Sequence, residues 1–256
     1  MRADRWLLTR GSALPHLAFA LAFFGAWELY GRLVNPILLP PISAVAAGLI
    51  QITFGGPLPA ALFTSLQLLV TGFSVALGLG LLLGVLIGRY QVANRTLGPF
   101  LNALYATPDI ALLPLILVWF GFGMTGRVVV VLLAAFFPIM INTYAGVRDA
   151  PAELIEVAES FGVHTEVGLL RNVVLPSAIP LIMAGVRLGI GRGVVGMAVA
   201  EVYLRLGGIG ALIVEYGAAF RIDLLLAAII PLPLLGIVLT KVFARIEHHF
   251  QYWRAV

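Results

Sequence analysis

Residues 61–88 form a stretch of the chain without a single charged side chain. About 20 apolar residues are enough for a helix to cross the hydrocarbon layer of a bilayer, so this segment is long enough to span a membrane. The rest of the chain is similar, because 61% of its 256 residues are hydrophobic and only 11% are charged, with a mean hydropathy of +1.04. A soluble domain carries about 25% charged residues. Lipid must therefore be the solvent for much of this chain.

The apolar segments predict an all-α membrane protein with six transmembrane helices. The expected spans are residues 15–32, 61–88, 98–121, 127–147, 178–201 and 224–243. Together they form one transmembrane domain, 15–246, with a short segment 1–14 before it and a tail 247–256 after it. Pro108 and Pro114 interrupt the third span, and a short helix over 43–50 is expected at the outer interface.

The placement of basic residues predicts the orientation of the chain. If the N-terminus is cytoplasmic, ten Lys and Arg residues fall in inside segments and four in outside segments. The positive-inside rule favours this arrangement, and an even number of spans then puts both termini in the cytoplasm. The arginines are scattered without a basic cluster, which argues against a nucleic-acid partner.

Glycines recur every four residues in two of the predicted spans. Glycines with this spacing share one helix face and allow a second backbone to approach closely, which is how helices associate in lipid. The expected packing partner is another helix of this chain or of a second copy. The two sets are Gly80, Gly84 and Gly88 in the second span, and Gly185, Gly189 and Gly193 in the fifth.

A polar segment with four glutamates separates the fourth and fifth spans. Its first part, 149–162, is predicted to be a short helix that Asp149 caps, with Pro151 in the first turn and Gly162 at the end. Leu154, Ala158 and Phe161 share one face of this helix. A second short helix is expected over 165–171.

The other face of the predicted 149–162 helix is acidic, with Glu153, Glu156 and Glu159. Helices that lie on a bilayer surface prefer Lys and Arg on the polar face. Docking of the apolar face to a cytoplasmic protein therefore explains this pattern better than membrane binding does.

The segment also resembles a known motif. Glu156-Val157-Ala158, then Gly162, then Leu175-Pro176 resembles the EAA loop of permease subunits of binding-protein-dependent ABC importers. Valine stands at the second position, and the interval from the glycine to Leu-Pro is one residue longer than in the family pattern. Further segments resemble the nitrate, sulfonate and taurine (bicarbonate) branch: 106–108, 113–114, 119–121, 136–139, 142–143, 146–147, 185–187, 200–201, 208–213 and 247–254.

The resemblance implies a type I ABC importer permease with six spans, in the bacterial inner membrane. Its expected partners are two ATP-binding subunits, a second permease copy in a homodimer, an external substrate-binding protein and membrane lipid. ATP and Mg²⁺ would be bound by the ATP-binding subunits, so no cofactor is expected in this chain. The resemblance implies coupling to those subunits through Glu153, Glu156, Ala158, Phe161, Gly162, Leu175 and Pro176. The expected cargo is a small anion or organic solute such as nitrate, a sulfonate or taurine.

The sequence contains no catalytic motif. The only lysine is Lys241, followed by Val242, so a P-loop is absent. No His-Glu-x-x-His or Gly-x-Ser-x-Gly occurs, and no metal site is expected, because His248 and His249 are adjacent and point in different directions. The chain is therefore expected to be a transport subunit rather than an enzyme.

Four charged residues inside predicted spans are candidates for the substrate pathway: Asp109, Arg187, Arg192 and Glu201. Charges in a span cost free energy and commonly serve a function. Two interpretations stay open, an internal ion pair between one of these arginines and one of these acids, or an anion-binding position at Arg192, which Gly191 and Gly193 flank.

Two other classes of protein remain as alternatives. An ion-gradient-driven secondary transporter or channel would be expected to show an internal repeat or half-helices with coordinating groups, and no repeat at a fixed interval is visible. A structural membrane scaffold would not need an acidic docking helix between spans.

Overall fold

The computed structural model describes residues 13–34 and 38–250, except for the side chains of 13, 14, 109, 246 and 248–250. These residues form two compact units. The first combines the described part of 1–59 with 212–230, and the second combines 60–211 with the described part of 231–256. Every regular element in the described residues is helical, which agrees with the predicted all-α class.

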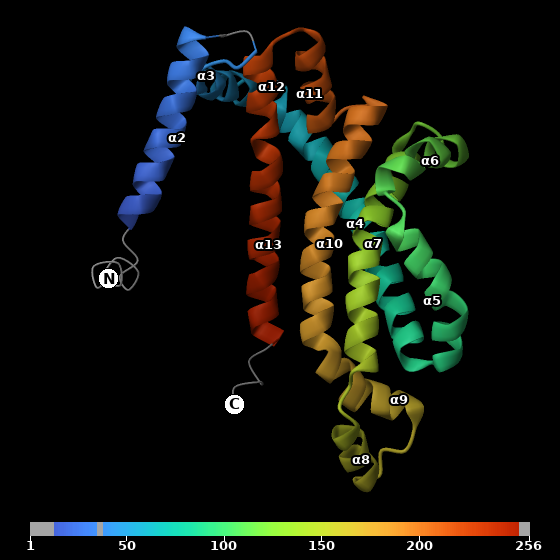
Figure 1. The fold of residues 1–256 in the computed structure, drawn as a ribbon. Coiled ribbons are helices and arrows are strands. Elements are labelled where there is room, and N and C mark those ends of the chain that lie inside the picture. Colours follow the sequence, from blue (N-terminus) through green and yellow to red (C-terminus); the bar gives the residue numbers. More distant parts are fainter. Residues whose placement is uncertain (1–12, 35–37, 251–256) are drawn as a thin grey trace. The chain divides into compact units, whose positions relative to one another are not determined.

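The helices follow one another along the chain as Figure 1 shows. Their bounds are α2 Ala13–Leu33, α3 Ile42–Thr53, α4 Leu58–Arg89, α5 Gln91–Ala106, η1 Asp109–Leu112, α6 Leu113–Phe120, α7 Met124–Arg148, α8 Ala152–Ser160, α9 Glu166–Leu169, η2 Leu170–Val174, α10 Leu175–Leu204, α11 Ile209–Ala218, α12 Ile222–Ile229 and α13 Pro231–Phe250. The predicted helix near 43–50 corresponds to α3, whereas α11 has no counterpart among the predicted elements.

Four helical segments among the described residues are long and apolar enough to cross a membrane. They are Leu58–Arg89, Met124–Arg148, Glu166–Leu204 and Ile222–Arg245, and the bent pair Gln91–Ala106 and Ile110–Phe120 would make a fifth. The predicted first span corresponds to α2. The protein is therefore a helical membrane protein with several spans, and the count of six stays a prediction.

Helix α7 forms the centre of the second unit, with α4 against one face. A Cβ built on Gly80 would lie 2.8 Å from Ile139 Cγ2, and one on Gly84 would lie 2.6 Å from Thr143 Cβ. A Cβ built on Gly88 would likewise lie 2.8 Å from Val147 Cβ. The partners follow in the same order along both helices, so α4 and α7 run parallel. Gly72, which the sequence pattern did not mark, extends this contact to Val131.

Helix α10 packs against another face of α7 and runs in the opposite direction (Figure 1). A Cβ on Gly185 would lie 2.7 Å from Asn142 Cβ, and one on Gly196 would lie 2.7 Å from Ala134 Cβ. A Cβ on Gly189, which stands between these two glycines, would lie 2.8 Å from Ile139 Cγ1. A Cβ on Gly193 would have more room, with Leu69 Cδ1 as its nearest atom at 3.2 Å. The packing partners of both sets of glycines thus belong to this chain. Helix α13 also packs on α10.

The third predicted span is broken at a single place. Thr107 and Pro108 separate α5 from η1, and the helical axes on the two sides differ by 93°. Proline lacks the N–H that would continue the helix, and it disfavours helical geometry in the residue before it. Pro114 was expected to interrupt the span as well, but it occupies the first turn of α6, where proline is accommodated.

The first unit is held together by contacts of α3. This helix packs on α12, where a Cβ on Gly48 would lie 3.0 Å from Leu224 Cδ2. Its start is tied to α2, because Glu28 Oε2 accepts a hydrogen bond from the Ser43 backbone N–H at 3.0 Å. Trp27 Nε1 donates to the Pro40 carbonyl at 3.1 Å. The short helix α3 is therefore packed on protein within this unit.

Candidate functional site

Helix α8 lies between α7 and α10 in the chain and begins later than predicted. Asp149 was expected to cap it, but Asp149 ends α7, pairs with Arg148 at 2.9 Å, and leaves Pro151 at the N-terminal cap of α8. The predicted end is confirmed. Gly162 has a φ of +88°, its N–H donates to the Glu159 carbonyl, and the Val163 N–H donates to the Ala158 carbonyl. This is the Schellman arrangement, which favours glycine at that position.

The apolar side of α8 faces a groove of its own chain. The groove has a volume of about 330 Å³ and lies between α8 and the residues that lead into α10. Its lining is Leu154, Val157, Ala158, Asn172, Val173, Pro176 and Ser177. Phe161 lies at the end of the helix and is 85% exposed, and the three glutamates of α8 are exposed as well. Phe161 is not among the described residues that line the groove, and its exposed aromatic ring is available as an anchor for a protein partner.

The segment after α8 leads into α10 without a break. Thr165 caps α9, because its Oγ1 accepts a hydrogen bond from the Gly168 N–H at 3.1 Å. The single π-helical turn η2 then joins α9 to α10, and the whole run Glu166–Leu204 is helical. Leu175 and Pro176 form the first turn of α10. A turn over residues 161–165 separates α8 from this run, but α8 contacts the run at η2, and movement of α8 can pass into α10 through that contact.

Arg89 at the end of α4 braces this segment. Its Nε and Nη2 both donate to Glu166 Oε2, at 2.9 and 2.7 Å. The Glu166 side chain is 63% exposed, and exposed pairs contribute only about 0–1 kcal/mol. The pair is therefore expected to orient the segment more than to stabilise the fold.

We expect Arg89→Gln to lower the free energy of unfolding by less than about 1 kcal/mol, because solvent screens the pair. Thermal melting in detergent, with Glu166→Gln and the double variant, measures this. A coupling energy well above 1 kcal/mol between the two sites would show that the pair is more than a surface contact.

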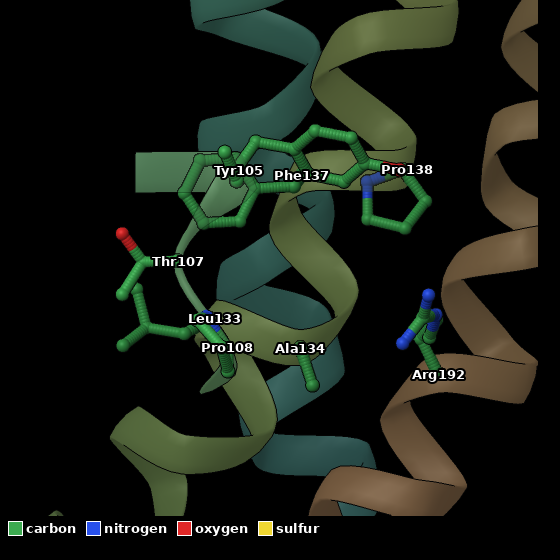
Figure 2. A pocket seen from close by; sticks show the side chains of 9 residues that line it. Tyr105, Thr107, Pro108, Leu133, Ala134, Phe137, Pro138 and Arg192 are labelled. Atoms are coloured by element: carbon green, nitrogen blue, oxygen red, sulfur yellow. The ribbon is translucent and has the colours of Figure 1, made fainter. Parts of the chain in front are cut away.

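A second site lies in the second unit, where α5, α7 and α10 meet. A cavity of about 320 Å³ opens there beside the break at Pro108 (Figure 2). Its lining is Tyr105, Ala106, Thr107, Pro108, Leu133, Ala134, Phe137, Pro138 and Arg192. Figure 2 shows Arg192 on the α10 wall and the Tyr105 and Phe137 rings toward the opposite side.

Arg192 is the one cationic residue among the described residues that line this cavity. It also lines a neighbouring cavity of about 260 Å³ with Pro108 and several aliphatic residues. No hydrogen bond or ion pair to Arg192 occurs among the described residues. The adjacent Gly191 faces open space, with nothing within 4 Å of a Cβ built on it. An arginine in the middle of a span costs about 2.5–3.5 kcal/mol on insertion scales, which a structural ion pair does not offset here.

Of the other three charged candidates, Arg187 and Glu201 are not among the described lining residues of this cavity. Arg187 pairs with Glu247 of α13, not with either of the acids considered from the sequence. Glu201 is 0% exposed and belongs to a hydrogen-bond network near the end of α10. The side chain of Asp109 lies outside the described residues.

The Glu201 carboxylate holds the turn that follows α10. Its Oε2 accepts hydrogen bonds from Ser65 Oγ and from the Gly210 N–H, both at 2.9 Å. Ser65 Oγ in turn accepts from the Ile209 N–H at 2.9 Å. Arg127 lies nearby and donates to the Leu206 carbonyl at 3.2 Å. The sequence analysis identified Glu201 but not Ser65 or Arg127. The one signal for these two residues in the sequence is that each is a polar residue within an apolar helix.

The part of the chain that the structure describes contains no group of three or more His, Asp or Glu residues able to hold a metal ion. The side chains of His248 and His249 lie outside that part. The two sites are instead a cavity with one described cationic residue beside a broken helix, and an exposed amphipathic helix that contacts the segment leading into the helix with this residue. Together with the membrane-spanning helices, they define a transport subunit.

Comparison with known proteins gives the family. Residues 76–252 match the family described as binding-protein-dependent transport system inner membrane component. The chain is 32% identical over 250 residues to a putative aliphatic sulfonates transport permease protein of Bacillus subtilis, covering 96% of this chain and 87% of that protein. It is 28% identical over 257 residues to the taurine transport system permease protein of Escherichia coli, covering 97% and 92%.

A third relative is the formylaminopyrimidine transport permease protein of Halalkalibacterium halodurans, 31% identical over 246 residues, with 94% of this chain and 96% of the relative covered. The chain belongs to the family of inner membrane components of binding-protein-dependent transport systems, the permease subunits of ABC importers. It is a multi-pass protein of the inner membrane.

Proposed function

We propose that this chain is the membrane subunit of an ATP-driven importer that carries a small anionic or organic solute into the cell. The observation that carries the proposal is the contact of α8 with η2, which runs without a break into α10, the helix that carries Arg192. An external binding protein delivers the solute. Both termini face the cytoplasm, on the same side as α8.

The energy for transport comes from a separate ATP-binding subunit that holds ATP and Mg²⁺, since this chain has no P-loop. Two such subunits each receive one α8. The exposed Phe161 ring inserts into a pocket of the ATP-binding subunit, and the acidic face, with Glu153 and Glu156, contacts the rim of that pocket. Ala158 and Gly162 allow close approach, because neither presents a bulky side chain.

Two copies of the chain form the translocation pathway in our proposal. The cavity at Arg192 is partly open rather than enclosed by this chain alone. A second copy related by a two-fold axis would complete its wall, which is the usual symmetry of such assemblies. The relatives named for sulfonates and taurine favour a solute with a sulfonate group, and Arg192, which has no partner among the described residues, agrees with the charge of that group.

Co-purification with the ATP-binding subunit tests the coupling role of α8. We expect Phe161→Ala to weaken the complex by roughly 2 kcal/mol or more, about 30-fold in affinity, because a central aromatic anchor is lost. Binding of the purified subunits in detergent gives the affinity, and ATP-dependent uptake in vesicles that also hold the binding protein gives the coupling.

Val92→Ala is the matched control, because Val92 is also an exposed apolar residue, at the start of α5. We expect it to bind and transport as the unchanged protein does. Solute uptake by vesicles that contain only this chain, driven by an ion gradient, would contradict the proposal and favour a secondary transporter.

A further inference from the structure

We propose that the cavity at Arg192 binds an organic anion in which a flat, unsaturated ring lies next to the acidic group. This inference rests on the proposed function, since it names the class of solute that passes this site. Neither an inorganic oxyanion nor an aliphatic zwitterion fits the lining as well, for reasons of charge, size and ring contacts.

The positive charge of Arg192 favours an anion as the ligand of the cavity. The Arg192 guanidinium has five N–H donors, and no described residue accepts a hydrogen bond from any of them. A planar guanidinium matches a carboxylate or a sulfonate group with two parallel hydrogen bonds. None of the described lining residues carries a carboxylate.

The size of the cavity favours an organic ligand over a small inorganic ion. The cavity measures about 320 Å³, whereas a water molecule takes up about 30 Å³ in the liquid, and an ion of four heavy atoms is only a few times larger. Sites for organic ligands begin at about 300 Å³. The cavity thus has room for a ring and an acidic group together.

Aromatic rings line the side of the cavity opposite Arg192. Tyr105 and Phe137 have ring centroids 5.8 Å apart with a tilt of 48°, and Phe136 packs edge-on against Phe137 at 5.0 Å. Phe137 is buried, so its position is fixed, while half-exposed Tyr105 keeps its hydroxyl free of any described partner. Pro108 and Pro138 add flat apolar surface. Aromatic ligands gain contact energy from such rings beyond the burial of area.

The neighbouring cavity accommodates an apolar substituent. It shares Pro108, Ala134 and Arg192 with the first cavity and is otherwise aliphatic, with Ile110, Val130, Val195 and Val199 among its lining. The anionic group of one ligand can therefore sit at Arg192 while its ring lies on Tyr105 and Phe137 and a side branch extends toward these aliphatic residues.

Binding of radiolabelled benzenesulfonate tests the proposal. The permease assembled with its ATP-binding subunit in nanodiscs is dialysed against the probe, and unlabelled cyclohexanesulfonate, taurine and nitrate compete. We expect benzenesulfonate to bind roughly 3-fold to 10-fold more tightly than cyclohexanesulfonate, which has the same charge and nearly the same size. Taurine and nitrate are expected to compete more weakly than both.

Three variants locate the site. Arg192→Gln is expected to weaken benzenesulfonate binding by roughly 10-fold or more, and Tyr105→Leu to remove the preference over cyclohexanesulfonate. Arg95→Gln is the control, because Arg95 is an exposed arginine on α5 about three helical turns from Tyr105. It is expected to leave binding unchanged.

Equal binding of the two ring sulfonates, tighter binding of taurine or nitrate, or unchanged binding in Arg192→Gln would overturn this inference while leaving the transport role intact. Failure of the chain to assemble with an ATP-binding subunit would overturn the proposed function, and it would be seen before any ligand is added. Ligand binding to the permease alone in nanodiscs then decides the chemistry of the cavity independently.

Discussion

Replacing Gly84 with leucine is expected to lower the free energy of unfolding by about 3 kcal/mol or more. A Cβ at this position would lie 2.6 Å from Thr143 Cβ and 2.8 Å from the Met140 carbonyl oxygen, so the clash begins with the first side-chain atom. Thr143 is fully buried and cannot turn away. The helices α4 and α7 must therefore separate. A thermal melt of the detergent-solubilised protein should show a midpoint lower by roughly 6–12 °C.

Gly78 supplies the control on the same helix. No atom outside the helix lies within 4 Å of a Cβ built there, and leucine has a higher helix propensity than glycine by up to about 1 kcal/mol. Gly78→Leu should leave the melting midpoint unchanged or raise it slightly. If both leucine variants melt alike, close contact between α4 and α7 does not hold the second unit together.

The spacing of the glycines indicated which helix faces pack, but not against what. Residues four apart share a face whatever the partner is, so the pattern left open whether the partner belonged to this chain or to a second copy. The structure places α7 against both sets. Gly72 and Gly196 escaped notice because they stand eight and three residues from the nearest member of each set. Contact geometry, not regular spacing, identifies them.

The ends of α8 show where local rules succeed and fail. Gly162 ends the helix as expected, because a positive φ is required there and glycine adopts it freely. The start at Asp149 was wrong because Pro151 disfavours helical geometry at Ala150, so a helix cannot run from Asp149 into Pro151. Asp149 instead completes the last turn of α7. A proline inside a predicted first turn therefore outweighed a good capping residue.

The partners of the charged residues in the spans could not be read from the sequence. Arg187 pairs with Glu247, 60 residues away, and Glu201 bonds to Ser65, 136 residues away. Only the packing of α10 against α13 and α4 brings these groups together. The same packing leaves Arg192 beside a cavity without a partner among the described residues, in contrast to Arg187 and Glu201.

Removing the Glu201 carboxylate is the second change expected to have a large effect. Glu201→Ala deletes the acceptor of two hydrogen bonds and leaves the Gly210 N–H and the Ser65 hydroxyl without that partner in a buried place. Hydrogen bonds to a charged group contribute about 1.5–3 kcal/mol, and an orphaned donor adds a desolvation cost. We expect a loss of about 3 kcal/mol, measured as a lower melting midpoint.

The turn after α10 should loosen in the same variant. Arg205, Gly207 and Gly208 all have positive φ, and a Cβ on Gly208 would overlap the Glu201 carboxylate, so this turn is folded closely over the carboxylate. Without the carboxylate, nothing anchors the backbone at Gly210, and limited proteolysis should cut between 205 and 210 faster than in the unchanged protein.

Glu201→Gln keeps nearly the same side-chain volume and changes only the hydrogen bonds, so it distinguishes the effects of the two on stability. Glutamine keeps one acceptor oxygen for the Gly210 N–H, so this variant should lose less stability than Glu201→Ala, by about 1 kcal/mol or more. Glu215→Ala, which removes an exposed carboxylate on α11, should change neither the melting midpoint nor the proteolysis rate. If Glu201→Ala resists proteolysis as well as Glu215→Ala does, the carboxylate does not anchor the turn, and Ser65 with its bond to the Ile209 N–H would be sufficient.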